Sequence, residues 1–508
     1  MREIQTDLLV IGGGINGTGI AVDAVGRGLN VVLCEADDLA SATSSASSKL
    51  VHGGLRYLEQ YEFKLVREAL REREVLMNKA PHIIQPLTFI LPHDKHLRPT
   101  WMIRAGMFLY DFLAGRMQLK RSKKISLVNT AEGSPLKDKY RVGFSYSDCR
   151  IDDARMVVLN ALQAKELDAE VLTYTKCISA HREGLVWKAI LKTKAGEEIH
   201  VKAEAIVNAA GPWVADLIHD VLETDSKSKV RLIKGSHIVV PKLYEGAHAY
   251  ILQNKDNRIV FAIPYGFTGA EQNEFTLIGT TDVNYEGDAS QVDISQEERV
   301  YLCDLINEYF DKPVKVEDIV WDYAGVRPLY DDDSDDPSKN TREYHFEKED
   351  KEGKAALLSI FGGKITTFRT LSEKAMVEVS KHFSGLTGPW TEKSKIPGGE
   401  AGSQAEIISI IEATHPWLDK KLAFRLATTY GLRTNNMLEG SASMCDLGQH
   451  FGYNLYQKEV EYLIENEWAT DVESIIWRRT KLGLWLKDDE KLKLADWLGD
   501  KKYIAPVK

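Results

Sequence analysis

Hydrophobic residues near the N-terminus fall into short runs separated by a glycine turn. Residues 8–11 form a continuous apolar run, as in a strand buried on both faces. The sequence Gly12-Gly-Gly14-Ile-Asn-Gly17 follows at once, and then a helix-like segment over 18–27. A second apolar strand over 29–35 ends in Glu35. This order predicts a dinucleotide-binding βαβ unit.

Each residue type in this unit has a distinct task. Gly12 permits the tight turn, Gly14 lets a pyrophosphate approach the backbone, and Gly17 lets the helix pack closely on the strand. Glu35 stands where it can bind the ribose hydroxyls of an adenosine.

The pattern further along the chain predicts three kinds of structure. Helical stripes occur over 62–79 and 152–167, and residues 184–201 alternate as a β-hairpin does. Residues 231–330 are rich in strands and predict a separate antiparallel sheet, and after about residue 390 the period is helical again, as over 405–413, 421–429, 457–465 and 472–485. We therefore predict a dinucleotide-binding domain from residues 1–80, 145–230 and 350–390, a capping domain from 81–144 and 231–349, and a C-terminal helical domain over 391–508.

Composition narrows the classes of function. The chain has 508 residues and a formal net charge of -10, which argues against nucleic acid as a partner because phosphate backbones need clustered cations. An anionic ligand would need a local basic cluster. The five cysteines are scattered, so we predict neither disulfides nor a metal site, and we expect a reducing, intracellular compartment and no signal peptide.

A membrane-spanning helix is not expected, because no apolar run reaches the roughly 20 residues that a bilayer requires. The nearest candidate covers 99–113 and is interrupted by Arg104 and Asp111. Two interpretations remain open: the stretch lies in a membrane surface, or it is a core helix.

The distribution of glycines points to flavin rather than nicotinamide. Two later strands end in "NAAGPW" (208–213) and "FGGKITTF" (361–368), far from the N-terminal glycine turn. Sequence-distant contacts suit a large, permanently held cofactor, and a helix N-terminus would stabilise an anionic reduced ring. The predicted cofactor is therefore a flavin.

Several long stretches carry a resemblance to a known family. "DLLVIGGGINGTGIAVDAVGRGL", "ATSSASSKLVHGGLRYLEQYEFKLVREALREREVL", "RLIKGSHIVVP", "IGTTDV", "GVRPL" and "FGGKITTFR" together resemble the bacterial FAD-dependent, aerobic glycerol-3-phosphate dehydrogenases over essentially the whole chain. The resemblance implies an α/β fold with a FAD-binding Rossmann-like domain of the D-amino-acid-oxidase type, an antiparallel-sheet substrate domain and a C-terminal α-helical domain. It also implies oxidation of sn-glycerol 3-phosphate to dihydroxyacetone phosphate, with electrons passed to a membrane quinone.

The same resemblance assigns candidate site residues. Arg56 and Arg327 would grip the substrate phosphate, with Tyr57 and Thr366 as further substrate contacts. His237 and Lys364 would lie near the reacting carbon, where either can serve as the base or stabilise charge. The residues expected to bind FAD are Gly12, Gly14, Gly17, Glu35, Ser44, Ser45, Ser47, Ser48, Lys49, Ala210, Gly211, Gly362, Gly363 and Lys364.

Two other functions are weighed against this one. A glycerophosphate oxidase of the same fold would hand electrons to oxygen, although the family resemblance implies that such oxidases carry an inserted segment not seen here. A flavin-loaded redox-sensing module would act through the helical domain without turning over substrate. The dehydrogenase interpretation also implies a homodimer bound peripherally to the cytoplasmic face of the inner membrane.

Overall fold

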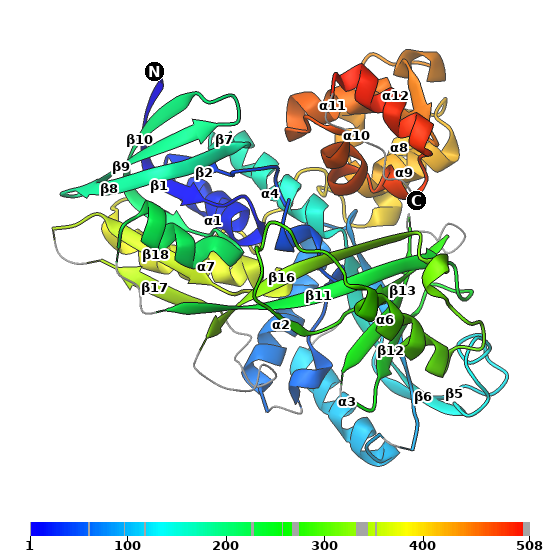
Figure 1. Ribbon diagram of the computed structural model, residues 1–508. Coiled ribbons are helices and arrows are strands. Elements are labelled where there is room, and N and C mark those ends of the chain that lie inside the picture. Colours follow the sequence, from blue (N-terminus) through cyan, green and yellow to red (C-terminus); the bar gives the residue numbers. More distant parts are fainter. Residues whose placement is uncertain are drawn as a thin grey trace.

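The computed structural model describes residues 2–58, 61–95, 97–115, 118–224, 228–256, 258–266, 274–331, 344–350 and 353–500; the side chain of Arg56 lies outside this description. Two large sheets meet near the middle of the molecule, and the C-terminal helices gather beside them (Figure 1).

The first sheet has a parallel core flanked by antiparallel strands. Its parallel strands lie in the order β18-β10-β1-β2-β7, and the helices α1, α4 and α7 pack beside one another over this sheet. The elements are β1 (Arg2–Ile11), α1 (Ile15–Gly26), β2 (Val31–Cys34), α4 (Asp153–Glu166), β7 (Glu170–Leu172), β8 (Thr175–Glu183), β9 (Val186–Thr193), β10 (Glu198–Asn208), β17 (His345–Glu349), β18 (Ala356–Phe361) and α7 (Phe368–Val379). The predicted βαβ unit is confirmed as β1–α1–β2.

The second sheet, here called the capping sheet, is antiparallel except for one parallel pair, β4 with β12. Its strands come from the predicted β-rich region and from 81–144, both of which the predicted capping domain included. It also takes residues 50–51 and 145–151, which the prediction gave to the first domain, because long-range pairing leaves no trace in local periodicity. Its strands are β3 (Leu50–Val51), β4 (Ile84–Pro92), β5 (Lys123–Ser126), β6 (Val142–Ile151), β11 (Lys229–Pro241), β12 (Ala249–Gln253), β13 (Ile259–Tyr265), β14 (Phe275–Gly279), β15 (Val283–Tyr285) and β16 (Trp321–Asp331).

Helices cover both faces of the capping sheet. α6 (Gln296–Tyr309) packs in one apolar cluster with it, and α2 (Phe63–Lys79) and α3 (Thr100–Ala114) pack in another. The helix α3 contains the stretch left open between core and membrane surface. Met107 and Tyr110 are buried, whereas Trp101, Phe108 and Phe112 are exposed. One face of α3 therefore packs on the protein and the other does not.

The chain crosses between the two sheets at two neighbouring points. Leu50 of β3 pairs with Arg150 of β6, and α4 begins at Asp153, just beyond the end of β6. A buried ion pair joins these crossings, with Lys49 Nζ 2.9 Å from Asp153 Oδ2.

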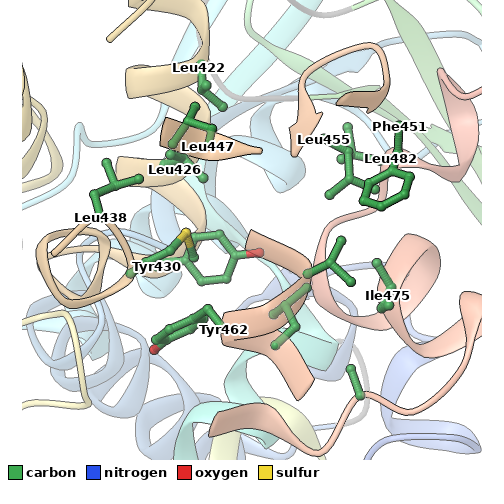
Figure 2. Packing of buried hydrophobic residues seen from close by; sticks show 14 of the residues in the cluster. Leu422, Leu426, Tyr430, Leu438, Leu447, Phe451, Leu455, Tyr462, Ile475 and Leu482 are labelled. Carbon is green, nitrogen blue, oxygen red and sulfur yellow. The ribbon is translucent and has the colours of Figure 1, made fainter. Parts of the chain in front are cut away.

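The C-terminal helices enclose a core of their own (Figure 2). They are α8 (Gln404–Thr414), α9 (Lys420–Tyr430), α10 (Arg433–Met437), α11 (Gln457–Glu467) and α12 (Asp488–Leu498), with a short hairpin of β19 (His450–Gly452) and β20 (Leu455–Tyr456). The helix expected over 472–485 is wrong in its extent. It breaks into Ser474–Arg479 and Leu482–Leu484, because Lys481 takes a left-handed conformation with φ of 60° that a helix cannot continue through.

Buried ion pairs fasten the C-terminal helices to the first sheet. Arg155 of α4 binds both carboxylate oxygens of Glu467 on α11, and Arg479 binds both oxygens of Asp38. All four side chains are almost fully buried. These pairs hold the helical domain in a fixed place against the first sheet.

We predict that Arg155→Met destabilises the protein by about 3–5 kcal/mol, because it leaves the Glu467 carboxylate buried without its partner. Urea unfolding followed by tryptophan fluorescence measures the change. The control is Arg71→Met, whose pair with Glu392 is exposed and should contribute less than about 1 kcal/mol. Equal effects of the two substitutions would contradict the assignment.

Candidate active site

The glycine turn lies where the chain leaves β1, beside the end of β10. Gly12 has a φ of 115°, and a Cβ atom there would come within 2.4 Å of the carbonyl oxygen of Ala209. A Cβ atom on Gly17 would lie 1.9 Å from the Gly12 oxygen. The strand order reverses between β1 and β10, which is where open α/β sheets bind their ligands.

Glu35 stands at the end of β2 and faces this turn. It accepts hydrogen bonds from the backbone N–H of Gly13 at 2.6 Å and of Asp37 at 2.9 Å. Burial raises the pKa of the Glu35 carboxyl, while the two N–H groups lower it. Sequence reasoning missed Gly13, whose backbone orients the acid; the run of three glycines was the available signal.

The two later glycine turns lie at the same edge of the sheet. Gly211, after β10, has a φ of 58°, with no atom within 4 Å of where its Cβ would be. The Gly362 carbonyl accepts from Asn16 Nδ2 at 3.0 Å, and a Cβ on Gly363 would lie 2.9 Å from that nitrogen. The Asn16 Oδ1 atom is buried without a hydrogen-bond partner. This bare, polar rim fits a dinucleotide cofactor, and Ala210 borders it at the start of the second turn.

The small-residue segment between β2 and β3 is tied to the scaffold. Ser44 Oγ accepts from the N–H of Ile15 at the start of α1, at 3.0 Å. Ser47 Oγ donates to Asp153 at 2.7 Å, and Lys49 Nζ donates to the same carboxylate. Ser45 Oγ donates to a carbonyl within the segment. The structure thus gives these four polar groups partners in the protein, and any contact with the cofactor would run along the backbone and small side chains.

The next member of the segment meets the capping sheet. Ser48 Oγ lies 2.9 Å from Nε2 of His237, whose ring stacks on Tyr323 with centroids 4.8 Å apart. His237 Nδ1 is buried without a partner. Burial and the charges of Lys49 and Arg327 hold the pKa of His237 well below its usual range. The imidazole is therefore neutral near pH 7, and its lowered pKa makes it a weaker base than a free imidazole.

Arg327 lies along β16 from Tyr323, on the same face of the strand. Between them Gly325 stands directly opposite Gly235 of β11. A Cβ on Gly235 would come within 2.6 Å of Thr280 Oγ1 and 3.2 Å of Arg327 Nη2, so these two side chains lie over that glycine. The small-residue segment crosses here, since a Cβ on Gly325 would come within 2.5 Å of Ala46. Arg327 forms an ion pair with Asp282, and both side chains are about one-third exposed.

Lys364 and Tyr57 form a second group. The Lys364 Nζ atom lies 4.0 Å from the centroid of the Tyr57 ring, and Thr366 Oγ1 accepts from the N–H of His52 at 3.3 Å. The backbone of Arg56 belongs to the short helical turn Leu55–Leu58 beside this group. Because the Arg56 side chain lies outside the described residues, its predicted phosphate contact cannot be placed.

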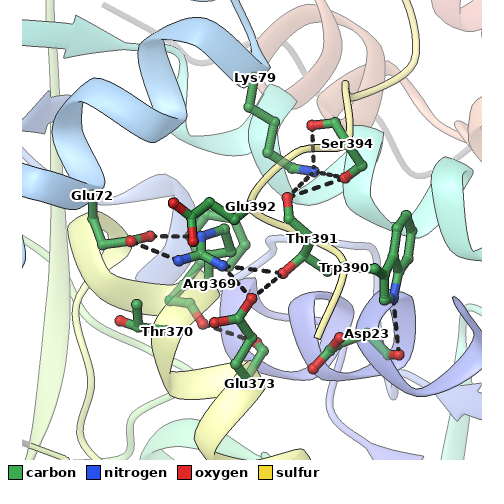
Figure 3. A network of polar contacts seen from close by, with 12 residues as sticks. Asp23, Glu72, Lys79, Arg369, Thr370, Glu373, Trp390, Thr391, Glu392 and Ser394 are labelled. Atoms are coloured by element: carbon green, nitrogen blue, oxygen red, sulfur yellow. Dashed lines mark hydrogen bonds and ion pairs between the residues drawn. The ribbon is translucent and has the colours of Figure 1, made fainter. Parts of the chain in front are cut away.

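A buried network holds α7 in position (Figure 3). Arg369 of α7 binds both oxygens of Glu72 on α2, at 2.8 and 2.6 Å. Lys79, at the end of α2, donates to Ser394 Oγ at 2.5 Å. The Arg369–Glu72 pair fixes α7 against α2, and the Lys79 bond ties the end of α2 to the segment that contains Ser394. Lys364 immediately precedes the turn Ile365–Thr367 that leads into α7.

The candidate residues therefore form a cofactor rim and two side-chain groups, joined by residues 43–58. The sequence did not indicate three contributors: Asn16, Tyr323 and Asp153. Their identities are unremarkable, and only the tertiary contacts single them out. Among the described residues, no cluster of three or more metal-binding side chains occurs.

We predict that Gly279→Ala displaces His237, because the added Cβ would lie 2.1 Å from the imidazole Cδ2. Relieving this clash should destabilise the protein by about 1–3 kcal/mol. Thermal unfolding and a crystal structure of the variant measure the two effects. Gly106→Ala in α3 is the control: its Cβ meets no atom within 4 Å, and it should stabilise by roughly 0.5–1 kcal/mol. An unmoved His237 would refute the prediction.

Comparison with known proteins identifies the family to which this chain belongs. Residues 7–366 match the family described as FAD dependent oxidoreductase, and residues 389–496 match the C-terminal domain of alpha-glycerophosphate oxidase. The chain is 53% identical to a glycerol-3-phosphate dehydrogenase of Pseudomonas aeruginosa, over 97% of this chain and 94% of that protein. It is 47% identical to the aerobic glycerol-3-phosphate dehydrogenase of Escherichia coli, over 97% of each chain.

One further relative and one solved structure are also similar to this chain. D-erythritol 1-phosphate dehydrogenase of Brucella abortus is 48% identical over 99% of this chain and 100% of its own. The glycerol-3-phosphate dehydrogenase of Bacillus halodurans, solved with FAD, has a TM-score of 0.76 and 26% identity, covering 98% of this chain and 89% of that one. These likenesses confirm the predicted fold class and FAD as the cofactor. The chain belongs to the family of FAD-dependent oxidoreductases that includes the glycerol-3-phosphate dehydrogenases.

Proposed function

We propose that this protein oxidises sn-glycerol 3-phosphate to dihydroxyacetone phosphate and passes the electrons to a membrane quinone. One observation carries the reaction: a neutral His237 and the Arg327 guanidinium flank the facing glycines Gly235 and Gly325 of the capping sheet, over which the small-residue segment runs. The relatives named glycerol-3-phosphate dehydrogenase support the choice of substrate.

The residues divide the work by their chemistry. FAD, when bound, supplies the acceptor for the hydride from the substrate's C2 carbon. Arg327, with Arg56, holds the phosphate, since a guanidinium matches phosphate oxygens with paired hydrogen bonds. Either His237 or Lys364 takes the hydroxyl proton, and the other stabilises the charge that develops. Tyr57 orients the Lys364 side chain, whose Nζ lies over its ring.

The 48% identity to D-erythritol 1-phosphate dehydrogenase favours a second candidate substrate. Both substrates present a phosphate monoester and a secondary hydroxyl, and they differ in length beyond the reacting carbon. Both substrates therefore belong in the first experiment.

We predict that sn-glycerol 3-phosphate bleaches the flavin band of the anaerobic, FAD-loaded protein. Arg327→Met should weaken substrate binding about 10- to 100-fold, the loss of a charge-assisted contact worth roughly 1.5–3 kcal/mol. The matched control is Arg299→Met, which removes a comparable ion pair with Asp322 away from the site. A flavin that stays oxidised with glycerol 3-phosphate but bleaches with D-erythritol 1-phosphate would reassign the substrate. Peroxide formed without quinone would favour the oxidase alternative.

Attachment to a membrane surface is part of the proposal. Trp101, Phe108 and Phe112 form one exposed face of α3, with exposed fractions of 68%, 64% and 71%. Tyr61, 79% exposed, precedes α2, which packs beside α3. The basic run over 120–124 follows closely in the chain. An aromatic face beside basic residues suits the boundary of an anionic bilayer. Within the described ranges, no helix is both long and apolar enough to cross one.

We therefore predict that the triple variant Trp101→Gln, Phe108→Gln, Phe112→Gln lowers partitioning onto anionic phospholipid vesicles at least tenfold, because each aromatic ring contributes on the order of 1 kcal/mol when it leaves water. Flotation of the FAD-loaded protein with vesicles measures this. Leu185→Gln, an exposed apolar residue in the β8–β9 turn, is the control. Unchanged partitioning of the triple variant would overturn the proposal.

Attachment to the membrane accounts for the proposed electron acceptor and for the proposed location in the cell. A quinone dissolves in the bilayer, so a dehydrogenase resting on the cytoplasmic face of the inner membrane meets its acceptor there. We extend the proposal to a homodimer, for which chemical cross-linking in detergent is the test.

A further inference from the structure

The connection between β14 and β15 lies beside Arg327. Both strands pair with β11, and residues 280–282 join them; we call this segment the β14–β15 turn. A Cβ on Gly235 would lie 2.6 Å from Thr280 Oγ1 and 3.2 Å from Arg327 Nη2. It would also lie 3.4 Å from the carbonyl oxygen of Thr281. The turn and the Arg327 guanidinium therefore share the space over this glycine.

The last residue of this turn binds Arg327 directly. Asp282 forms an ion pair with the Arg327 guanidinium through Nη2. The N–H donors of a guanidinium lie in one rigid plane, so a partner on one nitrogen fixes the direction in which the others point. Whatever holds the β14–β15 turn in place therefore also sets the orientation of Arg327.

Glu298, the third residue of α6, holds the turn in place. It is 7% exposed, and its Oε1 accepts from Thr281 Oγ1 at 2.8 Å and from Ser236 Oγ at 2.9 Å. Its Oε2 lies 2.7 Å from Lys234 Nζ and accepts from the N–H of Ser295 at 3.0 Å. One carboxylate thus ties the β14–β15 turn, β11 and α6 together.

This carboxylate lies behind the capping sheet as seen from the candidate active site. Because side chains alternate along a strand, Lys234 and Ser236 of β11 point to the face opposite His237. Ile238 points the same way as Ser236 and belongs to the apolar cluster shared with α6, which identifies that face as the α6 side. Glu298 therefore acts on the site from behind the sheet, through the turn.

The bonds to Glu298 depend on its negative charge. Burial raises the pKa of the Glu298 carboxyl, but the hydrogen-bond donors around it outweigh that effect and hold the pKa below its usual value. The group is therefore a carboxylate near pH 7. Hydrogen bonds to a charged acceptor are roughly twice as strong as those between neutral groups. An amide of the same shape has one oxygen acceptor instead of two, so it cannot accept from all four donors in the same way.

We propose that Glu298 is a positioning residue for Arg327, acting through Thr281 and Asp282 of the β14–β15 turn. The inference rests on the proposed function, in which Arg327 holds the substrate phosphate. A guanidinium that is already oriented loses less freedom when the substrate binds, so the network lowers KM. The phosphate takes no part in the hydride transfer itself, and kcat is therefore expected to be independent of Glu298.

The first test is the steady-state kinetics of FAD-loaded Glu298→Gln with sn-glycerol 3-phosphate and a soluble electron-accepting dye. KM should rise about 3- to 10-fold while kcat stays within about twofold, the pattern of lost ground-state binding. Glu459→Gln is the matched control. Glu459 is the third residue of α11, is 3% exposed and accepts from Arg425 and Tyr430 in the C-terminal core. An unchanged KM in Glu298→Gln, or an equal rise in the control, would overturn the proposal.

A milder pair of variants guards against misfolding of Glu298→Gln. Thr281→Val keeps the side-chain shape but removes the bond to Glu298 and the acceptor for the N–H of Ser236, at 2.9 Å. Thr281→Ser keeps the hydroxyl. The valine variant should raise KM by about the same 3- to 10-fold, whereas the serine variant should stay within about twofold of the parent protein. Equal KM values in the two variants would contradict the proposal.

Two further measurements separate positioning from a general loss of stability. In an Arg327→Met background, Glu298→Gln should raise KM no further, because the guanidinium through which it acts is missing; an additive rise overturns the proposal. A crystal structure of FAD-loaded Glu298→Gln should show Arg327 displaced from its place over Gly235. An unmoved guanidinium also overturns the proposal, whatever the substrate is. A parent flavin that neither glycerol 3-phosphate nor D-erythritol 1-phosphate bleaches would refute the proposed function, and the crystal structure would still decide what holds Arg327.

Discussion

The structure depends on one buried ion pair, between Lys49 and Asp153. Lys49 ends the small-residue segment and precedes the first strand of the capping sheet, and Asp153 begins α4 after the chain returns from that sheet. Both side chains are nearly inaccessible to water, so neither charge could remain without the other. Because the two crossings are held together, the cofactor rim and the capping sheet keep a fixed spacing.

That spacing determines the chemistry of the site. Glycines at the ends of β1, β10 and β18 leave the cofactor rim without bulky side chains there. The facing capping sheet supplies His237 and Arg327. The small-residue segment lies between the rim and the capping sheet and contacts both. Ser44 bonds to the start of α1, and Ser48 bonds to His237. Its small residues are needed because it passes directly over Gly325. A bulkier loop could not occupy this space.

The C-terminal helices make their contribution through position rather than catalysis. They have an independent core, yet Arg155, Asp38 and Asp152 of the first part each bind a residue from the C-terminal part. Asp152 lies where the chain crosses from the capping sheet to α4, so its pair with Lys481 lets the C-terminal domain stabilise that crossing. This is a physical role that the sequence did not indicate.

Local pattern was enough to identify the βαβ unit, because a glycine turn between an apolar strand and a helix is encoded within about thirty residues of Leu8. It also indicated the helical C-terminal region and, through the family resemblance, FAD and the candidate residues His237, Arg327 and Lys364. Pairings between residues about 50 to 190 positions apart were decided only by the tertiary structure: the register of β4 against β6, Ser48 meeting His237, and Tyr323 stacking on that ring. The physical reason is that periodicity records which face of an element is buried but not which distant element buries it.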